Sequence, residues 1–143
     1  MYQKDYILRM IEMLGDLIRG ILGLITRGDL KQADEKLSEA YYTMLRKDAW
    51  VFQNIPIHEL TKRLLEEHNF TNGHLEILAE LFYAEANLKS ARKKFADSLL
   101  YLEKSLVLFE FVDQTGRTFS NDRQEKMEQI RKRILEIGGI PPA

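Results

Sequence analysis

The stretch "RGDLKQADEKLSEAYYTML", from Arg27 to Leu45, alternates small and large apolar residues at helical spacing. Small Ala33 and Ala40 are interleaved with large Leu30 and Leu37. Because residues three and four apart share one face of a helix, the pattern predicts an amphipathic helix that a second helix can approach closely. The stretch therefore favours an antiparallel helical hairpin as the building unit of the fold.

Turn signals around this stretch predict where the helices begin and end. Gly28 is a C-terminal stop for the preceding helix, and Asp29 is an N-cap with Gln32 completing a capping-box pattern. Alternation with a period of two residues, which would predict strands, is not evident. We therefore expect one all-α domain over residues 1–143, with about six helices in antiparallel hairpins at about 4–26, 30–47, 56–69, 74–91, 94–112 and 121–137.

The segment between the second and third expected helices carries three large apolar residues, Trp50, Val51 and Phe52. We expect this connector to fill the core with all three side chains. Pro56, which follows it, is favoured at the first position of a helix and predicts the start of the third one.

The chain aligns with itself at a shift of 65 residues, which brings two hairpins into register. The alignment pairs Leu17 with Phe82, Ile21 with Ala86, Leu30 with Phe95, Ala33 with Ser98, Leu37 with Leu102, and Ala40 with Ser105. Over roughly 60 of the 143 residues, these hairpins resemble the tetratricopeptide repeat. Ile21 stands where that family has a small residue, and Leu24 where it has tyrosine. The resemblance implies a right-handed helical stack with a groove for a protein or peptide.

A second resemblance lies at the start of the chain. The segment "YQKDYILRMIEMLGDLI", from Tyr2 to Ile18, is similar to the opening of a family of short, uncharacterised bacterial helical proteins. This resemblance implies a bacterial cytoplasmic protein without an assigned activity, and it supplies no catalytic residues.

The first expected helix is apolar over most of its circumference. Its charged residues between positions 7 and 25 are Arg9, Glu12, Asp16 and Arg19, whose spacing places them on one narrow stripe. A helix of this kind must be buried on several sides. Four explanations remain open: it is the central helix of the bundle, it forms a homodimer interface, it binds a foreign protein, or it lies on a membrane surface.

Composition bounds the classes of function and location. The 21 basic and 22 acidic residues give a net charge of −1, which provides no general attraction for nucleic acid or anionic membranes. The chain has no cysteine, so disulfides and thiolate zinc sites are excluded, and a reducing cytoplasm suits it. Charged residues interrupt the apolar N-terminal run, which argues against a signal peptide or an integral membrane segment.

Motifs for catalysis or metal binding are incomplete. The stretch "IHELTK", residues 57–62, begins like a zinc-protease helix, but Lys62 stands where the second histidine is required. His68 and His74 flank a turn near the carboxylates at 66–67, which point to different sides of a helix and form no metal face. We therefore expect no catalytic residue, no metal site and no cofactor.

Two basic clusters lie at 89–94 and 131–133. Binding of single-stranded nucleic acid requires stacking aromatic residues beside such clusters. Phe95, the adjacent aromatic residue, has the pattern of a core residue, so we interpret both clusters as solvated helix ends and expect no nucleic-acid partner.

The remaining candidates for function are aromatic and charged groups along the expected groove. In the pairs at 41–42 and 82–83, we expect one aromatic ring of each to face inward. In a tetratricopeptide-like hairpin the first helix lines the groove, which places Tyr83 and Asn87 on its wall with parts of the Arg9–Arg19 stripe.

These observations favour a non-enzymatic protein–protein interaction or scaffold module that forms a homodimer. The alternatives are a small-ligand binder or enzyme with a polar site inside the bundle, and a protein that associates with a membrane surface through its first helix.

Overall fold

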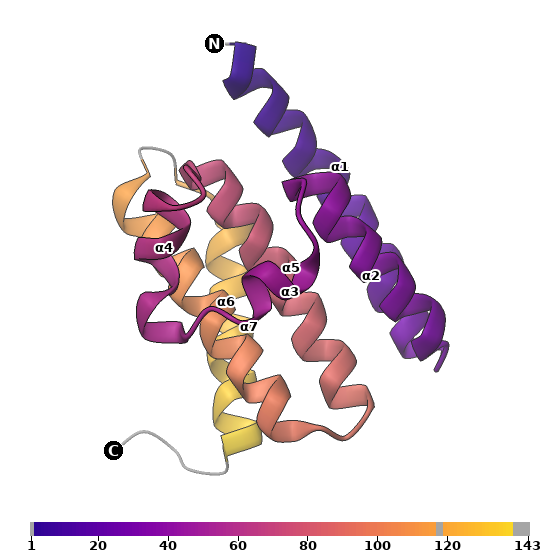
Figure 1. Ribbon diagram of the computed structural model, residues 1–143. Coiled ribbons are helices and arrows are strands. Elements are labelled where there is room, and N and C mark those ends of the chain that lie inside the picture. The colour runs from indigo at the N-terminus through magenta and orange to yellow at the C-terminus, as the bar shows by residue number, and fades with distance from the viewer. Residues whose placement is uncertain (1, 117–118, 139–143) are drawn as a thin grey trace.

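The structure, a computed structural model, describes residues 2–116 and 119–138, with side chains from Tyr6 onward, and is all-helical there (Figure 1). The prediction of an all-α fold is confirmed. The described residues form seven α-helices and a 3-10 turn, η1: α1 Tyr2–Thr26, α2 Leu30–Leu45, α3 Ala49–Gln53, η1 Ile57–Glu59, α4 Leu60–Glu66, α5 Asn72–Ala91, α6 Phe95–Thr115 and α7 Asn121–Gly138. No helix of the described residues is long and apolar enough to cross a membrane.

The third predicted helix, at about 56–69, is observed as the turn η1 followed directly by α4, over residues 57–66. The connector before it contains a short helix that was not predicted, α3. Pro56 has extended backbone angles and precedes η1, and Asn69 adopts left-handed angles (φ 56°) that end the helical path after α4. Of the apolar residues in the connector, Phe52 is fully buried, but Trp50 is 63% exposed, contrary to the expectation that it fills the core.

The two hairpins α1–α2 and α5–α6 repeat the same backbone turn. The helices before the turn end at residues 26 and 91, and those after it begin at 30 and 95, so the offset is the 65 residues of the self-alignment. Gly28 and Lys93, which are 65 residues apart, both have left-handed φ angles, of 81° and 60°. Asp29 and Lys94 follow with φ and ψ of −85° and 69°, and −95° and 74°. The internal repeat is therefore a property of the fold as well as of the sequence.

Small residues hold each hairpin closely packed. In the first hairpin Ala33 and Ala40 are buried on α2. Their counterparts on α6, Ser98 and Ser105, are also buried, and each hydroxyl donates a hydrogen bond of 2.7 Å to a backbone carbonyl of α5. Serine therefore replaces alanine without leaving an unsatisfied polar group in the core.

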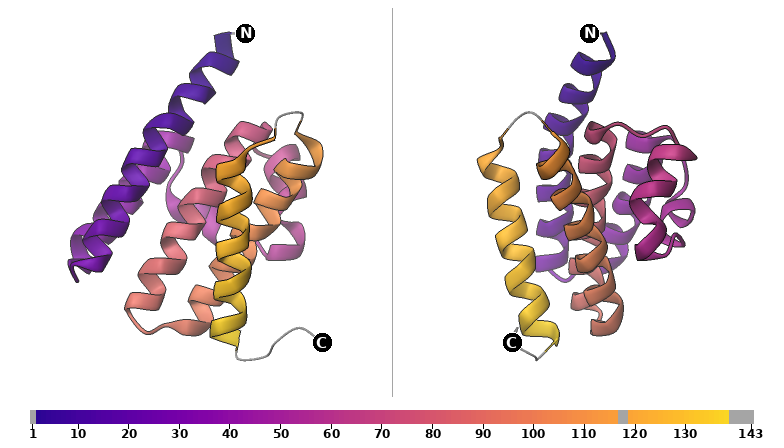
Figure 2. Two further views of the ribbon diagram at one scale, coloured as in Figure 1. Left: turned by 180° about the vertical axis from the view of Figure 1, so that it is seen from behind. Right: turned by 90° about the vertical axis from the view of Figure 1, so that its left-hand side faces the viewer.

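The centre of the bundle is α5. Eleven of its twenty residues are buried, and α1, α2 and α6 pack around it. Of the four explanations left open for the first helix, the one that makes it central does not hold: α1 lies at one side, against α2 and α5, and its N-terminal part extends past the other helices (Figures 1 and 2).

Helix α1 runs in the same direction as α5. Their first turns meet where a side chain at Gly73 would collide with Ile7, at 2.2 Å from its Cγ2. At the other end, Arg92 after α5 pairs with Asp34 on α2 at 3.5 Å. Glycine at position 73 therefore permits the close approach of the two helices.

The left-handed angle at Lys93 provides a test of the repeat. Replacing Lys93 by glycine removes the steric penalty of a side chain at φ 60°, and we expect the free energy of unfolding to rise by about 0.5–1 kcal/mol. Denaturant unfolding measures this change. The control is Lys94→Gly, at φ −95°, which we expect to lower stability. A loss of stability in Lys93→Gly contradicts the assignment of the turn.

Candidate functional site

The predicted charged stripe is exposed. Arg9, Glu12, Asp16 and Arg19 lie on the side of α1 that faces away from α2 and α5, and Asp16 and Arg19 form an ion pair. Three large apolar residues flank the stripe, Tyr6, Leu8 and Met13, and they are 47, 51 and 57% exposed. We call these seven residues the outer face of α1.

The internal repeat explains why this face is open. At the shift of 65 residues, Glu12, Asp16 and Arg19 align with Ile77, Leu81 and Ala84, which are all fully buried on α5. Ile77 and Ala84 continue the face on which Gly73 meets α1, because residues four and seven apart share a side of a helix. The outer face of α1 is therefore the position where a preceding hairpin would stack, and charged residues occupy it.

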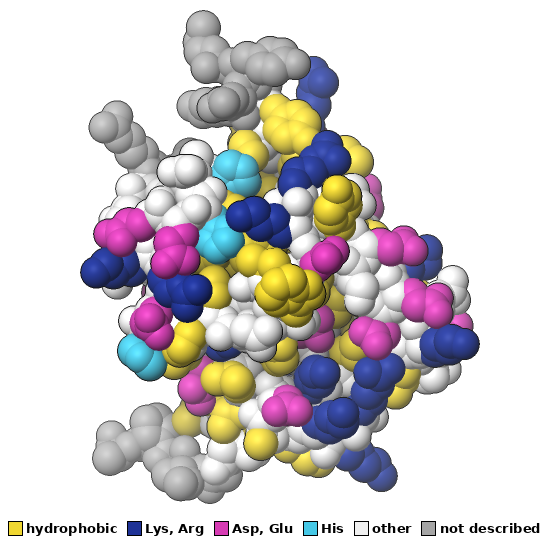
Figure 3. All heavy atoms as spheres, viewed as in Figure 1, with side chains coloured by type: hydrophobic (Ala, Val, Ile, Leu, Met, Phe, Trp, Pro, Cys, Tyr) yellow, Lys and Arg dark blue, Asp and Glu magenta, His cyan; other side chains and the backbone are white. Residues whose placement is uncertain are grey.

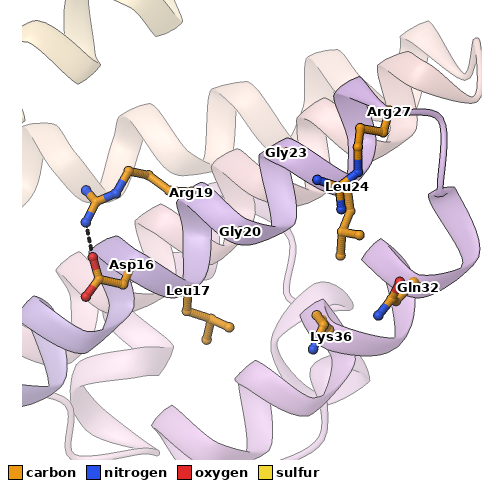
Figure 4. Close-up of a pocket in the computed structure, with 9 residues that line it drawn as sticks. All are labelled: Asp16, Leu17, Arg19, Gly20, Gly23, Leu24, Arg27, Gln32 and Lys36. Atoms are coloured by element: carbon orange, nitrogen blue, oxygen red, sulfur yellow. Dashed lines mark hydrogen bonds and ion pairs between the residues drawn. The ribbon is translucent and has the colours of Figure 1, made fainter.

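A hollow of about 470 Å³ lies beside this face, between α1 and α2 (Figure 4). Gly20 and Gly23 form part of its wall, and both would have room for a side chain, which shows that the space is open. Arg19, Arg27 and Lys36 surround the hollow, whereas Asp16 is the acidic group beside it and is paired with Arg19. The hollow between α1 and α2 is thus bordered by three basic side chains and one acidic one.

Further apolar groups reach the surface near α1. Tyr42 on α2 and Trp50 on α3 are 56 and 63% exposed. Figure 3 shows hydrophobic side chains over α1, α2 and α3 on the viewed face, with charged side chains between them. The expectation that one ring of the pair Tyr41 and Tyr42 faces inward is confirmed, since Tyr41 is fully buried.

Tyr83 and Asn87 lie apart from the stripe, on the side of α5 that faces α7 (Figure 2). The Lys126 ammonium group is 4.3 Å from the centre of the Tyr83 ring. Asn87 accepts a hydrogen bond from Arg133 at 3.1 Å. Phe82 is fully buried, as expected for one ring of the pair, but Tyr83 is also buried, beneath α7, and does not line an open groove wall as predicted. The structure therefore divides the six predicted binding residues between two surfaces, and their role in binding stays a prediction.

The basic cluster at 89–94 lies at the corner between α5 and α6. Phe95 is 50% exposed, so the expectation that it belongs to the core is wrong. It is the first residue of α6, and its counterpart Leu30, the first residue of α2, is also incompletely buried. The expected absence of a nucleic-acid partner stays a prediction.

A buried polar cluster joins α3 to the central helices, and the sequence analysis missed it. Gln53 donates a hydrogen bond of 2.8 Å to the Glu85 carboxylate, and Lys104 donates one of 3.0 Å to the backbone carbonyl of Gln53. Burial raises the pKa of Glu85 to about 7 and lowers the pKa of Lys104. A glutamate and a lysine inside the apolar runs "LFYAEANL" and "LEKSLVLF" are the signals that indicate such a site.

The histidines have structural contacts. His74 accepts a hydrogen bond from the Thr71 N–H, and the Thr71 side chain caps the backbone of α5 in return. His68 lies 2.9 Å from the Lys47 ammonium group, and burial together with that charge lowers its pKa. The described residues contain no group of three side chains arranged to hold a metal ion.

Comparison with protein-family models, curated proteins and solved structures finds no match to this chain. The resemblances to the tetratricopeptide repeat and to the bacterial family therefore depend on the residues quoted above.

The buried Glu85 predicts a pH-dependent stability. Its pKa is about 7 in the folded chain against an ordinary 4.5, so the folded state retains a proton that the unfolded state releases. Glu85 therefore favours folding most below pH 4.5, and this contribution is lost as the pH rises through 7. The substitution Glu85→Gln preserves an acceptor for Gln53 but introduces a side chain that does not ionise. We expect the change that it causes in the free energy of unfolding to be about 2–3 kcal/mol more favourable at pH 8 than at pH 5.

Unfolding in urea at both pH values measures this difference. The control is Glu128→Gln, on the exposed side of α7, which we expect to change stability equally at both pH values. A pH-independent effect of Glu85→Gln contradicts the assigned burial of the carboxyl group.

Proposed function

We propose that this chain is a non-enzymatic interaction module, built from tetratricopeptide-like hairpins, that binds a second copy of itself through the outer face of α1. The observation that carries the proposal is the exposure of Tyr6, Leu8 and Met13 on an edge helix, around a stripe of charges. Exposed apolar groups rimmed by polar ones are typical of protein interfaces. The common turn of the two hairpins supports the tetratricopeptide-like architecture.

The order of charges on α1 favours a second copy as the partner. In an antiparallel pair of α1 helices with the two-fold axis between residues 12 and 13, Arg9 faces Asp16 of the other copy in both directions. The same register places Tyr6 opposite Arg19, which suits a cation–π contact. A register displaced by three residues would place Arg9 opposite Arg19 and Glu12 opposite Asp16. The charges therefore favour this antiparallel register over the displaced one.

Binding of an anionic ligand in the hollow between α1 and α2 is a second candidate function, in place of binding a second copy of the chain. The three basic side chains around that hollow favour it, because cationic groups attract phosphate and carboxylate groups. This candidate predicts that an anionic compound raises the melting temperature of the chain and that Lys36→Glu abolishes the increase.

Charge-exchange variants test the dimer. Arg9→Asp and Asp16→Arg each turn two attractive contacts of the dimer into repulsive ones, and we expect each variant alone to weaken dimerisation at least about tenfold. An equimolar mixture of the two variants restores opposite charges in both contacts. We expect the mixture to form a heterodimer with an affinity within about threefold of the original.

Light scattering coupled to gel filtration gives the mass of each sample over a range of concentrations. Lys132→Asp, on the exposed side of α7, makes the same change of charge as Arg9→Asp and serves as the matched control. We expect the control to remain dimeric. Monomers in every sample, or a mixture that dimerises no better than its components, contradict the proposal.

A further inference from the structure

Helix α7 is held to the bundle by both apolar and charged groups. Its buried residues are Arg123, Met127 and Ile130. Arg123 pairs with Glu76 at 3.3 Å and with Asp113 at 3.2 Å, which joins α7 to α5 and α6 together. Ile134 and Ile137 continue the apolar stripe of Met127 and Ile130 and are partly buried against the core.

A second row of contacts continues along the helix. Lys126 pairs with Glu80 at 3.2 Å while its ammonium group lies over the Tyr83 ring. Arg131 pairs with Glu110 at 3.6 Å. The four acidic residues of α7 are all exposed: Asp122, Glu125, Glu128 and Glu136. Four of the five basic residues of α7, all but the exposed Lys132, thus contact α5 or α6, and its acidic groups face solvent.

The surface beneath α7 is correspondingly acidic. Glu76 and Glu80 come from α5, and Glu110 and Asp113 come from α6. These carboxylates are 20 to 41% exposed at the side chain, so α7 partly shields them from water. We call the four residues, together with Tyr83 and Asn87, the acidic seat. A basic helix complements this surface, and an acidic one would be repelled from it.

The packing of α5 on the first hairpin provides a comparison for the packing of α7 on the second. Both α5 and α7 lie against an antiparallel hairpin and run in the same direction (Figures 1 and 2). The face of α5 that rests on the first hairpin carries fully buried apolar residues, Ile77, Leu81 and Ala84. The contacts of α7 combine an apolar stripe with ion pairs; those of Lys126 and Arg131 are partly exposed and are screened by salt, whereas the buried Arg123 is screened much less. Because three residues of α7 are buried, against eleven of α5, α7 is the helix that can leave its place while the remainder of the bundle stays folded.

We propose that the acidic seat binds a basic amphipathic helix of a partner protein and that α7 is the resident intramolecular competitor for it. The pattern of α7 defines the partner: basic residues at the positions of Arg123, Lys126 and Arg133, around large apolar residues at the positions of Met127 and Ile130. Binding then requires that α7 be displaced, which makes the affinity depend on how firmly α7 is held. This proposal is independent of the outer face of α1.

A labelled synthetic peptide of residues 119–138 is the probe. We measure its fluorescence anisotropy with the full chain, with Lys126→Glu and with Glu128→Lys. Lys126→Glu weakens the resident helix by placing a carboxylate against Glu80, and we expect it to increase peptide affinity at least about fivefold. Glu128→Lys alters an exposed residue on the same helix and is expected to leave the affinity within about twofold. A peptide with Arg123 and Lys126 both changed to glutamate is expected not to bind.

Thiol labelling of the full chain tests the displacement directly. Because the chain has no cysteine, Met127→Cys introduces a single thiol under α7, and Leu78→Cys introduces one in the core of α5. We expect salt and added peptide to accelerate labelling at 127 at least about fivefold and to leave labelling at 78 unchanged. This measurement applies even where Lys126→Glu fails to fold.

Two results would overturn the proposal. One is peptide binding that is absent or unaffected by the charges of the peptide. The other is a thiol at 127 that is labelled as slowly as the one at 78, with and without peptide.

Discussion

The burial of α5 on all sides is the constraint on which the rest of the structure depends. A helix with apolar residues around most of its circumference must have neighbours in several directions, and α1, α2 and α6 provide them. The same enclosure removes Glu85 from water and raises its pKa, and it requires the hydroxyls of Ser98 and Ser105 to bond to the carbonyls of α5. The enclosure of α5 therefore accounts for both the apolar core and the buried polar contacts of Glu85, Ser98 and Ser105.

Helices α1 and α7 lie at the two ends of the stack and differ in the groups that they expose. Helix α1 exposes the face that α5, its counterpart in the repeat, buries, and charges replace apolar residues there. Terminal units of helical stacks need such a polar face to remain soluble. Helix α7 covers the other end and exposes its acidic groups, while its basic groups bind α5 and α6. Our two proposals follow from this asymmetry: one end retains exposed apolar groups that suit association, and the other is closed by a helix with three buried residues.

The sequence predicts the hairpins well because their signals are local. The spacing of Ala33 and Leu37, the cap at Asp29 and the left-handed Gly28 all act within a few residues, and α2 and its turn form as expected. The 65-residue shift predicts the second hairpin through the same local pattern. The third predicted helix forms after Pro56 but ends earlier than predicted, at Glu66. Helix α3 was missed because a short apolar run in a connector does not by periodicity distinguish a helix from a loop.

Positions that depend on distant parts of the chain could not be predicted. Helices α1 and α5 are equally apolar in the sequence, yet α5 is central, because the packing of α6 and α1 determines which faces meet. Tyr83 and Asn87 were predicted on an open groove, and α7, more than thirty residues later, covers them. The charged stripe on α1 was predicted from spacing alone. Its position at the open end of a stack became evident only from the aligned residues of α5, which are buried.

Amide hydrogen exchange along the whole chain, measured at a concentration that favours the monomer, tests the central claim most directly. The account predicts that the amides of α5 exchange slowest, through global unfolding, and that α7 and the N-terminal half of α1 exchange through smaller openings with much lower protection. Equal protection of α1, α5 and α7 would contradict it, because the three helices would then belong to one cooperative core with no end free to bind.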